Sequence, residues 1–188
     1  MSTLPNILTA LRLVAVPVMV WAFVQDHGAQ GGMRWLALGI FAGAAFTDLL
    51  DGYLARRWSV VTTFGKLADP IADKVLVLAA LGMLAWNHEV SWWPLIVVAV
   101  REVAVTLGRL AVASTVVIPA SAGGKAKTVA LNLSIGLFLL PGAPPWVDTL
   151  ALVILVVAVV IALVSGLDYG RRILVARREA HGNESHPA

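Results

Sequence analysis

The sequence predicts an all-α integral membrane protein with six transmembrane helices, and three observations lead to this fold class. The chain has 188 residues, of which 59% are hydrophobic and 13% charged, whereas an ordinary soluble domain is about 45–50% apolar. Its mean hydropathy is +0.84. Apolar stretches recur along the chain, and short links rich in Gly, Pro and polar residues separate them. Cysteine is absent, which excludes disulfides, zinc-thiolate sites and thiol catalysis.

The individual helices follow from these stretches and links. A transmembrane helix requires about 20 mostly apolar residues, and the plainest candidate is the uncharged run from Thr149 to Leu167. The first, third and fifth helices end at the polar or Pro-rich links Gln25–Gly32, Asn87–Ser91 and Pro141–Pro145. In order, we expect helices over residues 6–25, 34–57, 64–87, 92–118, 126–141 and 147–174. The transmembrane domain then covers residues 1–178, and residues 179–188 form a polar tail.

The basic residues predict the orientation. They flank the second link, occur in the fourth and follow the sixth helix: Arg56, Arg57, Lys66, Lys125, Lys127, Arg171, Arg172, Arg177 and Arg178. Of the 14 lysines and arginines, Arg34 is the exception at an opposite-side link. Cytoplasmic loops carry the excess of positive charge, so both termini are expected in the cytoplasm. The net charge of +3 therefore reports topology, and no nucleic-acid partner is expected. Four tryptophans near the outer boundaries are expected to be interfacial anchors: Trp86, Trp92, Trp93 and Trp146.

Four aspartates lie where a membrane protein rarely has them. Asp48 and Asp51 are at i, i+3 near the end of the second helix, and Asp69 and Asp73 are at i, i+4 near the start of the third. Each pair shares a helix face, and a short link makes the two helices antiparallel neighbours. An ionisable residue at mid-membrane costs about 2.5–3.5 kcal/mol and usually marks a functional site.

Converging carboxylates would repel one another unless cations neutralise them. Two divalent cations would balance the four negative charges, and the all-oxygen ligand set indicates Mg²⁺ or Mn²⁺. The alternative is that the aspartates form cytoplasmic-end salt bridges with nearby cations: Arg56, Arg57, Lys66 and Lys74.

The stretch DLLDGYLARRWSVVTTFGKLADPIADK, residues 48–74, resembles the D-x2-D-G-x2-A-R-x8-G-x3-D-x3-D motif of the CDP-alcohol phosphatidyltransferases. The resemblance implies a six-helix, homodimeric membrane fold that transfers a phosphatidyl group from a CDP-linked lipid to an alcohol and releases CMP. By motif position, the metal ligands would be Asp48, Asp51, Asp69 and Asp73, with Asp73 also the general base. The cytidine diphosphate pocket would be lined by Gly52, Ala55, Arg56 and Gly65. The segment PNILTALR resembles the family's N-terminal segment near the nucleotide, through Asn6, Thr9 and Arg12.

Basic residues on and after the fourth helix point to an anionic acceptor. Arg101 lies well inside its predicted span, and Lys125 and Lys127 follow the pair Gly123-Gly124. With Arg109, these residues are candidates to bind the acceptor's phosphate, since phosphate favours Arg forks and Lys point charges. Alternatively, Arg109 pairs with Glu102 on one helix face, and the lysines are plain cytoplasmic charge.

Glycerol 3-phosphate is the first choice of acceptor. The segments TFGKLADPIADKVLV, REV and GKAKT resemble the branch of the family that uses it. Many members of this branch have a glutamine three residues after the threonine of GKAKT, and Leu131 stands there in this sequence. The resemblance therefore supports the acceptor less closely than the reaction. The same chemistry with phosphatidylglycerol, giving cardiolipin, or with an inositol phosphate remains open, and a divalent-cation transporter is a remote alternative. The expected location is the inner or plasma membrane, with CDP-diacylglycerol as donor and the site facing the cytoplasm.

Overall fold

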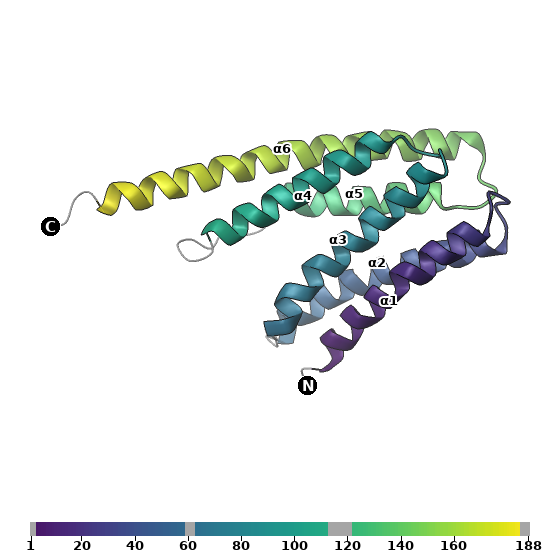
Figure 1. Cartoon of the computed structure of the whole chain (residues 1–188), viewed down its shortest axis with the longest axis horizontal. Coiled ribbons are helices and arrows are strands. Elements are labelled where there is room, and N and C mark those ends of the chain that lie inside the picture. The colour runs from purple at the N-terminus through teal and green to yellow at the C-terminus, as the bar shows by residue number, and fades with distance from the viewer. Residues whose placement is uncertain (1–2, 59–62, 113–121, 185–188) are drawn as a thin grey trace.

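The computed structural model describes residues 3–58, 63–112 and 122–184, with the side chains of residues 10–47, 74–108 and 123–173. Within these ranges the chain is all-α, as predicted (Figure 1). The six helices are α1 (Thr3–Gln25), α2 (Gly32–Trp58), α3 (Thr63–Trp86), α4 (Trp92–Val112), α5 (Ala122–Phe138) and α6 (Pro145–Glu184).

The helix boundaries differ from the predicted ones mainly near the C-terminus. Helix α5 begins at Ala122 rather than at residue 126, and α6 continues to Glu184 rather than ending at 174. Residues 179–184 of the predicted polar tail are therefore helical. Residues 175–180, which lead into this stretch and include its first two residues, contain Val, Ala, Arg and Glu but neither Gly nor Pro, so nothing in them stops the helix. Residues 113–118 of the predicted fourth helix lie outside the described residues.

The links α1–α2, α3–α4 and α5–α6 lie together at one end of the molecule (Figure 1). The backbone N–H of Gly142, in the α5–α6 link, donates to Oε1 of Gln30 in the α1–α2 link at 2.9 Å. Exposed tryptophans mark the same end, as the sequence predicts for interfacial anchors: Trp86, Trp92, Trp93 and Trp146. This shared end is the arrangement that consecutive antiparallel helices produce.

A buried arginine holds that end together. The side chain of Arg34, in the first turn of α2, is 2% exposed. Its two terminal nitrogens donate to the two carboxylate oxygens of Glu89 at 2.7 and 2.5 Å, and NH2 also donates to the carbonyl of Phe138 at 2.6 Å. The guanidinium carbon lies 5.1 Å from the centre of the Phe23 ring. Arg34 is thus the basic exception at the outer links because it binds three other segments of the fold there.

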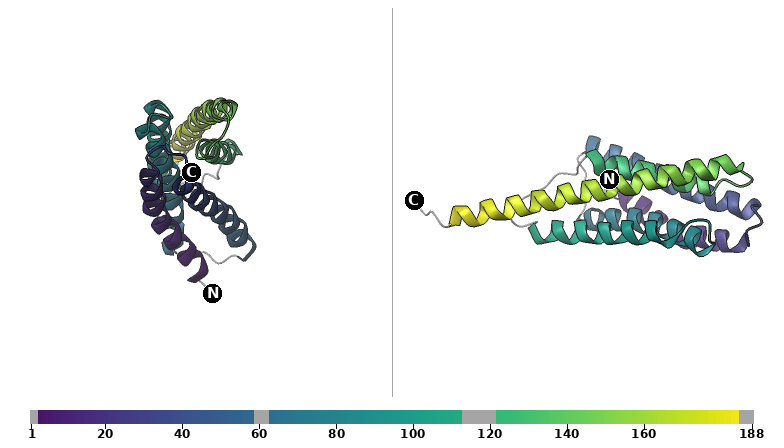
Figure 2. Two further views of the ribbon diagram at one scale, coloured as in Figure 1. Left: turned by 90° about the vertical axis from the view of Figure 1, so that its right-hand side faces the viewer. Right: turned by 90° about the horizontal axis from the view of Figure 1, so that it is seen from above.

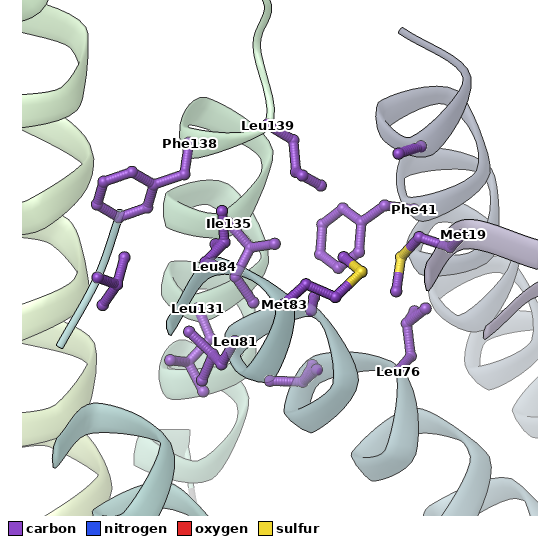
Figure 3. Packing of buried hydrophobic residues seen from close by; sticks show 14 of the residues in the cluster. Met19, Phe41, Leu76, Leu81, Met83, Leu84, Leu131, Ile135, Phe138 and Leu139 are labelled. Atoms are coloured by element: carbon purple, nitrogen blue, oxygen red, sulfur yellow. The ribbon is translucent and has the colours of Figure 1, made fainter. Parts of the chain in front are cut away.

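Helix α3 lies at the centre of the packing. It contacts α1, α2, α4 and α5, and its side chains meet those of the neighbouring helices in one apolar core (Figure 3). Figure 3 places Met19 of α1, Phe41 of α2 and Ile135 of α5 around Leu84 and Met83 of α3. On the other side, α6 packs along both α4 and α5 (Figure 2).

Helix α6 is apolar on every face between residues 150 and 164. Ala151, Leu155 and Ala158 are fully buried against the bundle, while Val153 and Val160 on the outer face are more than half exposed. An all-round apolar helix with one exposed face is typical of a segment that contacts lipid. Among the described residues, Pro145–Ile173 is the segment long and apolar enough to cross a membrane. Within the residues whose side chains are described, α1, α2 and α3 contribute the shorter apolar stretches Ala10–Gln25, Gly32–Thr47 and Lys74–Trp86.

Candidate active site

The four aspartates lie on two helices that contact each other. Asp48 and Asp51 are in the second half of α2, and Asp69 and Asp73 are in the first half of α3. Because both segments are helical throughout, each pair stays on one helix face, as its spacing predicts. The four carboxylates lie outside the described side chains, so their convergence on a metal cluster stays a prediction. Among the described side chains, no three or more His, Asp or Glu residues lie close enough together to hold a metal ion.

For the predicted nucleotide-binding residues, too, the structure describes the backbone and not the side chains. Gly52, Ala55 and Arg56 belong to α2 and Gly65 to α3, so they flank the aspartates along the same two helices. Asn6 and Thr9 belong to α1. What their side chains contact lies outside the described residues.

Arg12 of α1 lies in a groove that extends to the residue before Asp48. Its side chain is 2% exposed and lines, with Thr47, a groove of about 300 Å³ between α1 and α2. Thr47 directly precedes Asp48, so the groove ends beside the motif. Gly39 and Gly43 line the same groove, and a Cβ added at either would meet no atom within 4 Å in the described part of the chain. These two glycines form a GxxxG, a pattern that is common at close helix contacts, but they make no such contact within the described residues.

A second group of charged side chains surrounds Glu102 of α4, which is 8% exposed. Its Oε1 accepts a hydrogen bond from NH1 of Arg101 at 2.8 Å and one from Nζ of Lys127 on α5. Its Oε2 lies 3.8 Å from Nζ of Lys74 on α3. Two of the four predicted acceptor residues, Arg101 and Lys127, are thus brought together on one carboxylate.

Arg101 reaches across to α6. Its Nε donates to the carbonyl of Ala162 at 3.2 Å, and NH2 donates to Oγ of Ser165 at 3.1 Å. Gly166 makes this path possible, because a Cβ at that position would lie 3.2 Å from Cγ of Arg101. Arg101 also lines an apolar groove of about 440 Å³ between α4 and α6.

The other two predicted acceptor residues are not part of this group as described. Lys125 is exposed, whereas Lys127 is buried, since residues two apart on a helix point about 200° apart. The side chain of Arg109 lies outside the described residues, so its pairing with Glu102 stays untested. Within the described residues Glu102 pairs with Arg101, Lys127 and Lys74 instead.

The space between α3, α4 and α5 inside this group is small. A cavity of about 20 Å³ lies there, lined in part by Lys74, Glu102, Lys127 and Thr128. That volume holds about one water molecule and is too small for a phosphate group. An anion that binds Arg101 and Lys127 must therefore approach them from outside this cavity.

Sequence reasoning missed several members of the group. Lys74 was considered only as a salt-bridge partner of the aspartates, and its bond to Oγ1 of Thr106 was not anticipated. Ser165 and Gly166 lie on the apolar sixth helix and carry no charge to draw notice. The one available signal was the pair Gly166 and Gly170, four residues apart on α6, which is a common sign of close helix approach.

The sequence of this chain is similar to those of known proteins along most of its length. The family model described as CDP-alcohol phosphatidyltransferase matches residues 2–164. The chain is 43% identical over 173 residues to a "Probable phosphatidylglycerophosphate synthase" of Mycobacterium tuberculosis, covering 92% of this chain and 82% of that protein. It is 37% identical over 185 residues to the CDP-diacylglycerol–glycerol-3-phosphate 3-phosphatidyltransferase of Bacillus subtilis, covering 90% and 94%.

A relative with a different name matches a shorter stretch. The "Cardiolipin synthase (CMP-forming)" of Streptomyces coelicolor is 34% identical over 154 residues, covering 80% of this chain and 71% of that protein. The chain belongs to the CDP-alcohol phosphatidyltransferase family of membrane enzymes.

Proposed function

We propose that this enzyme transfers the phosphatidyl group of CDP-diacylglycerol to glycerol 3-phosphate, giving phosphatidylglycerophosphate and CMP. The relatives from Mycobacterium tuberculosis and Bacillus subtilis, which cover most of the chain, support this choice by their names. The structural observation that carries the acceptor is the group of Lys74, Arg101 and Lys127 around the buried carboxylate of Glu102. Lys74 of this group directly follows Asp73 along α3, so an acceptor phosphate bound by the group lies close to the proposed base.

The aspartates supply the reaction centre in this proposal. Asp48, Asp51, Asp69 and Asp73 would hold two divalent cations, Mg²⁺ or Mn²⁺, because an all-carboxylate ligand set on two contacting helices suits hard ions. When bound, such ions clamp a diphosphate and stabilise its departing oxygen. Asp73 takes the proton from the acceptor hydroxyl as the new O–P bond forms and the bond to the CMP oxygen breaks.

Residues beside the aspartates would bind the nucleotide of the donor. We assign this role to six positions on α1, α2 and α3: Asn6, Thr9, Gly52, Ala55, Arg56 and Gly65. Small residues next to a metal site let a bulky diphosphate approach the backbone closely. The lipid chains of the donor would then remain in the bilayer.

We further propose that all six helices cross the inner or plasma membrane, with the aspartates at the cytoplasmic face and two copies forming a homodimer. The exposed apolar face of α6 and the grouping of three links and four tryptophans at one end support the six-span arrangement. The basic residues near the other ends of the helices support the orientation. The homodimer rests on the family resemblance.

The test is an assay of CMP release by the purified enzyme in detergent or vesicles, with CDP-diacylglycerol and Mg²⁺ or Mn²⁺. We expect release to require glycerol 3-phosphate and to stop when EDTA removes the metal. Release with an inositol phosphate instead would retain the reaction but refute the acceptor. Membership of an enzyme family sets aside the cation-transporter alternative, and metal flux into vesicles without CMP release would revive it.

Cardiolipin synthesis is the second candidate, because a relative of that name covers 80% of this chain. Phosphatidylglycerol would be the acceptor in that case. It is a phosphodiester with one negative charge, whereas the phosphomonoester glycerol 3-phosphate carries nearly two at neutral pH and suits several clustered cations better. CMP release with phosphatidylglycerol, and none with glycerol 3-phosphate, would select this function.

A further inference from the structure

A single buried carboxylate holds cationic side chains from three helices. Oε1 of Glu102 accepts from Arg101 of α4 and Lys127 of α5, and Oε2 faces Lys74 of α3. We propose that Glu102 is a positioning residue that sets the spacing between the Arg101 guanidinium and the Lys127 ammonium for the acceptor's phosphate. This inference rests on the proposed function, because it takes glycerol 3-phosphate as the acceptor.

The physical reason lies in the shared oxygen. Two donors hydrogen-bonded to one oxygen lie within about 6 Å of each other, since each bond is about 3 Å long. Two positive charges at that distance repel strongly in a protein interior, and the carboxylate of Glu102 offsets this repulsion. Without it, Arg101 and Lys127 move apart, and a phosphate no longer meets both at hydrogen-bonding distance.

Arg101 has an independent anchor that preserves the fold when Glu102 changes. Its bonds to the Ala162 carbonyl and to Oγ of Ser165 hold it against α6. Loss of the carboxylate therefore alters the spacing of the two cations more than it alters the packing of α4 on α6.

Glu102 also connects this spacing to α3. Nζ of Lys74 donates to Oγ1 of Thr106, and that hydroxyl donates to the backbone carbonyl of Glu102 at 2.7 Å. Lys74 directly follows Asp73, so the residue that positions the phosphate is linked to the helix that carries the proposed base. An acceptor held by Arg101 and Lys127 is thereby placed relative to Asp73 as well.

The test compares Glu102→Gln with Glu89→Gln in steady-state assays of CMP release. Glu89 is a matched control, because its carboxylate also binds an arginine, Arg34, but it lies in the α3–α4 link and not in the middle of α4. We expect Glu102→Gln to raise the KM for glycerol 3-phosphate at least tenfold, while the KM for CDP-diacylglycerol changes less than twofold and kcat falls less than threefold. Glu89→Gln should leave both KM values within twofold of the wild type.

An unchanged or lowered KM for glycerol 3-phosphate in Glu102→Gln overturns the inference, since a lowered KM means that Glu102 competes with the phosphate. An equal rise in both KM values overturns it too, because a general loss of structure would cause that. Should Glu102→Gln fail to fold, Gly166→Ala serves instead. Its new Cβ lies 3.2 Å from Cγ and 3.5 Å from Nε of Arg101, and it should shift Arg101 and raise the same KM selectively, whereas an unchanged KM refutes the inference. Absence of CMP release by the wild type with glycerol 3-phosphate would refute the proposed function instead.

Discussion

Removal of the Glu89 side chain should destabilise the fold more than any change at an exposed ion pair. The Glu89→Ala variant leaves the Arg34 guanidinium, 2% exposed, without the carboxylate that binds both of its terminal nitrogens. Breaking a buried pair by removing one partner costs about 3–5 kcal/mol, because the remaining charge is uncompensated. Since the Glu89 side chain is 23% exposed and water enters once it is removed, we expect the lower end, about 3 kcal/mol.

The assay is thermal unfolding in detergent, followed by tryptophan fluorescence. For a chain of this length, 1 kcal/mol corresponds to about 2–4 °C in Tm, so Glu89→Ala should lower Tm by about 6–12 °C. The control is Asp168→Ala, which breaks the i, i+4 pair with Arg172, whose side chains are 48% and 54% exposed. An exposed helix pair is worth about 0.3–0.5 kcal/mol, and Tm should fall by about 1–2 °C.

A double variant isolates the charge effect. Arg34→Met combined with Glu89→Leu removes both charges, and replacement of a buried pair by apolar residues is often close to neutral. We expect it to recover part of the Tm lost in Glu89→Ala, though not the hydrogen bond from Arg34 to the Phe138 carbonyl. Equal Tm losses in Glu89→Ala and Asp168→Ala would refute the reasoning, because burial would then make no difference to the cost of an unpaired charge.

Three further predictions concern the site and the helices. Asp73→Asn should reduce kcat at least 100-fold, since a general base contributes about 10²–10⁴. Bound Mn²⁺, measured by electron paramagnetic resonance, should stay near the wild-type level, because the asparagine keeps one carbonyl oxygen and the other three aspartates remain; retained turnover would remove Asp73 from the role of base. Lys127→Ala should raise the KM for glycerol 3-phosphate about tenfold, whereas Lys125→Ala, which changes an exposed side chain, should leave this KM within twofold. Equal effects of the two variants would count against Lys127 as an acceptor ligand. Gly136→Ala should raise Tm by about 2–4 °C, because Ala stabilises a helix relative to Gly by about 1 kcal/mol and an added Cβ meets no described atom within 4 Å. A lower Tm would show that another group packs closely against this position.

The acceptor group shows how far sequence alone could reach. Arg101 was identifiable because a charge inside an apolar stretch is costly and therefore conspicuous, and Lys127 because it follows the pair Gly123-Gly124. Helical spacing offered Arg109 as an alternative partner of Glu102, because spacing within one helix cannot report the contacts that Glu102 makes with α3 and α5. The separation of Lys127 from Lys125 likewise required the packing of α5 against α6, α3 and α2, which decides which face of α5 is buried.

Composition and local pattern determined the broad properties of this protein: an all-α apolar chain, the order of its helices, and a motif whose aspartates repeat at helical spacing on two adjacent segments. These follow from the sequence because hydrophobic length and helical periodicity act over a few neighbouring residues. Only the tertiary structure decided that Arg34 binds Glu89 and Phe138 at the outer end, and that Gly166 gives Arg101 a path across α6. Such contacts join residues dozens of positions apart, and they depend on how close two helices lie and how each is rotated, which no local pattern specifies.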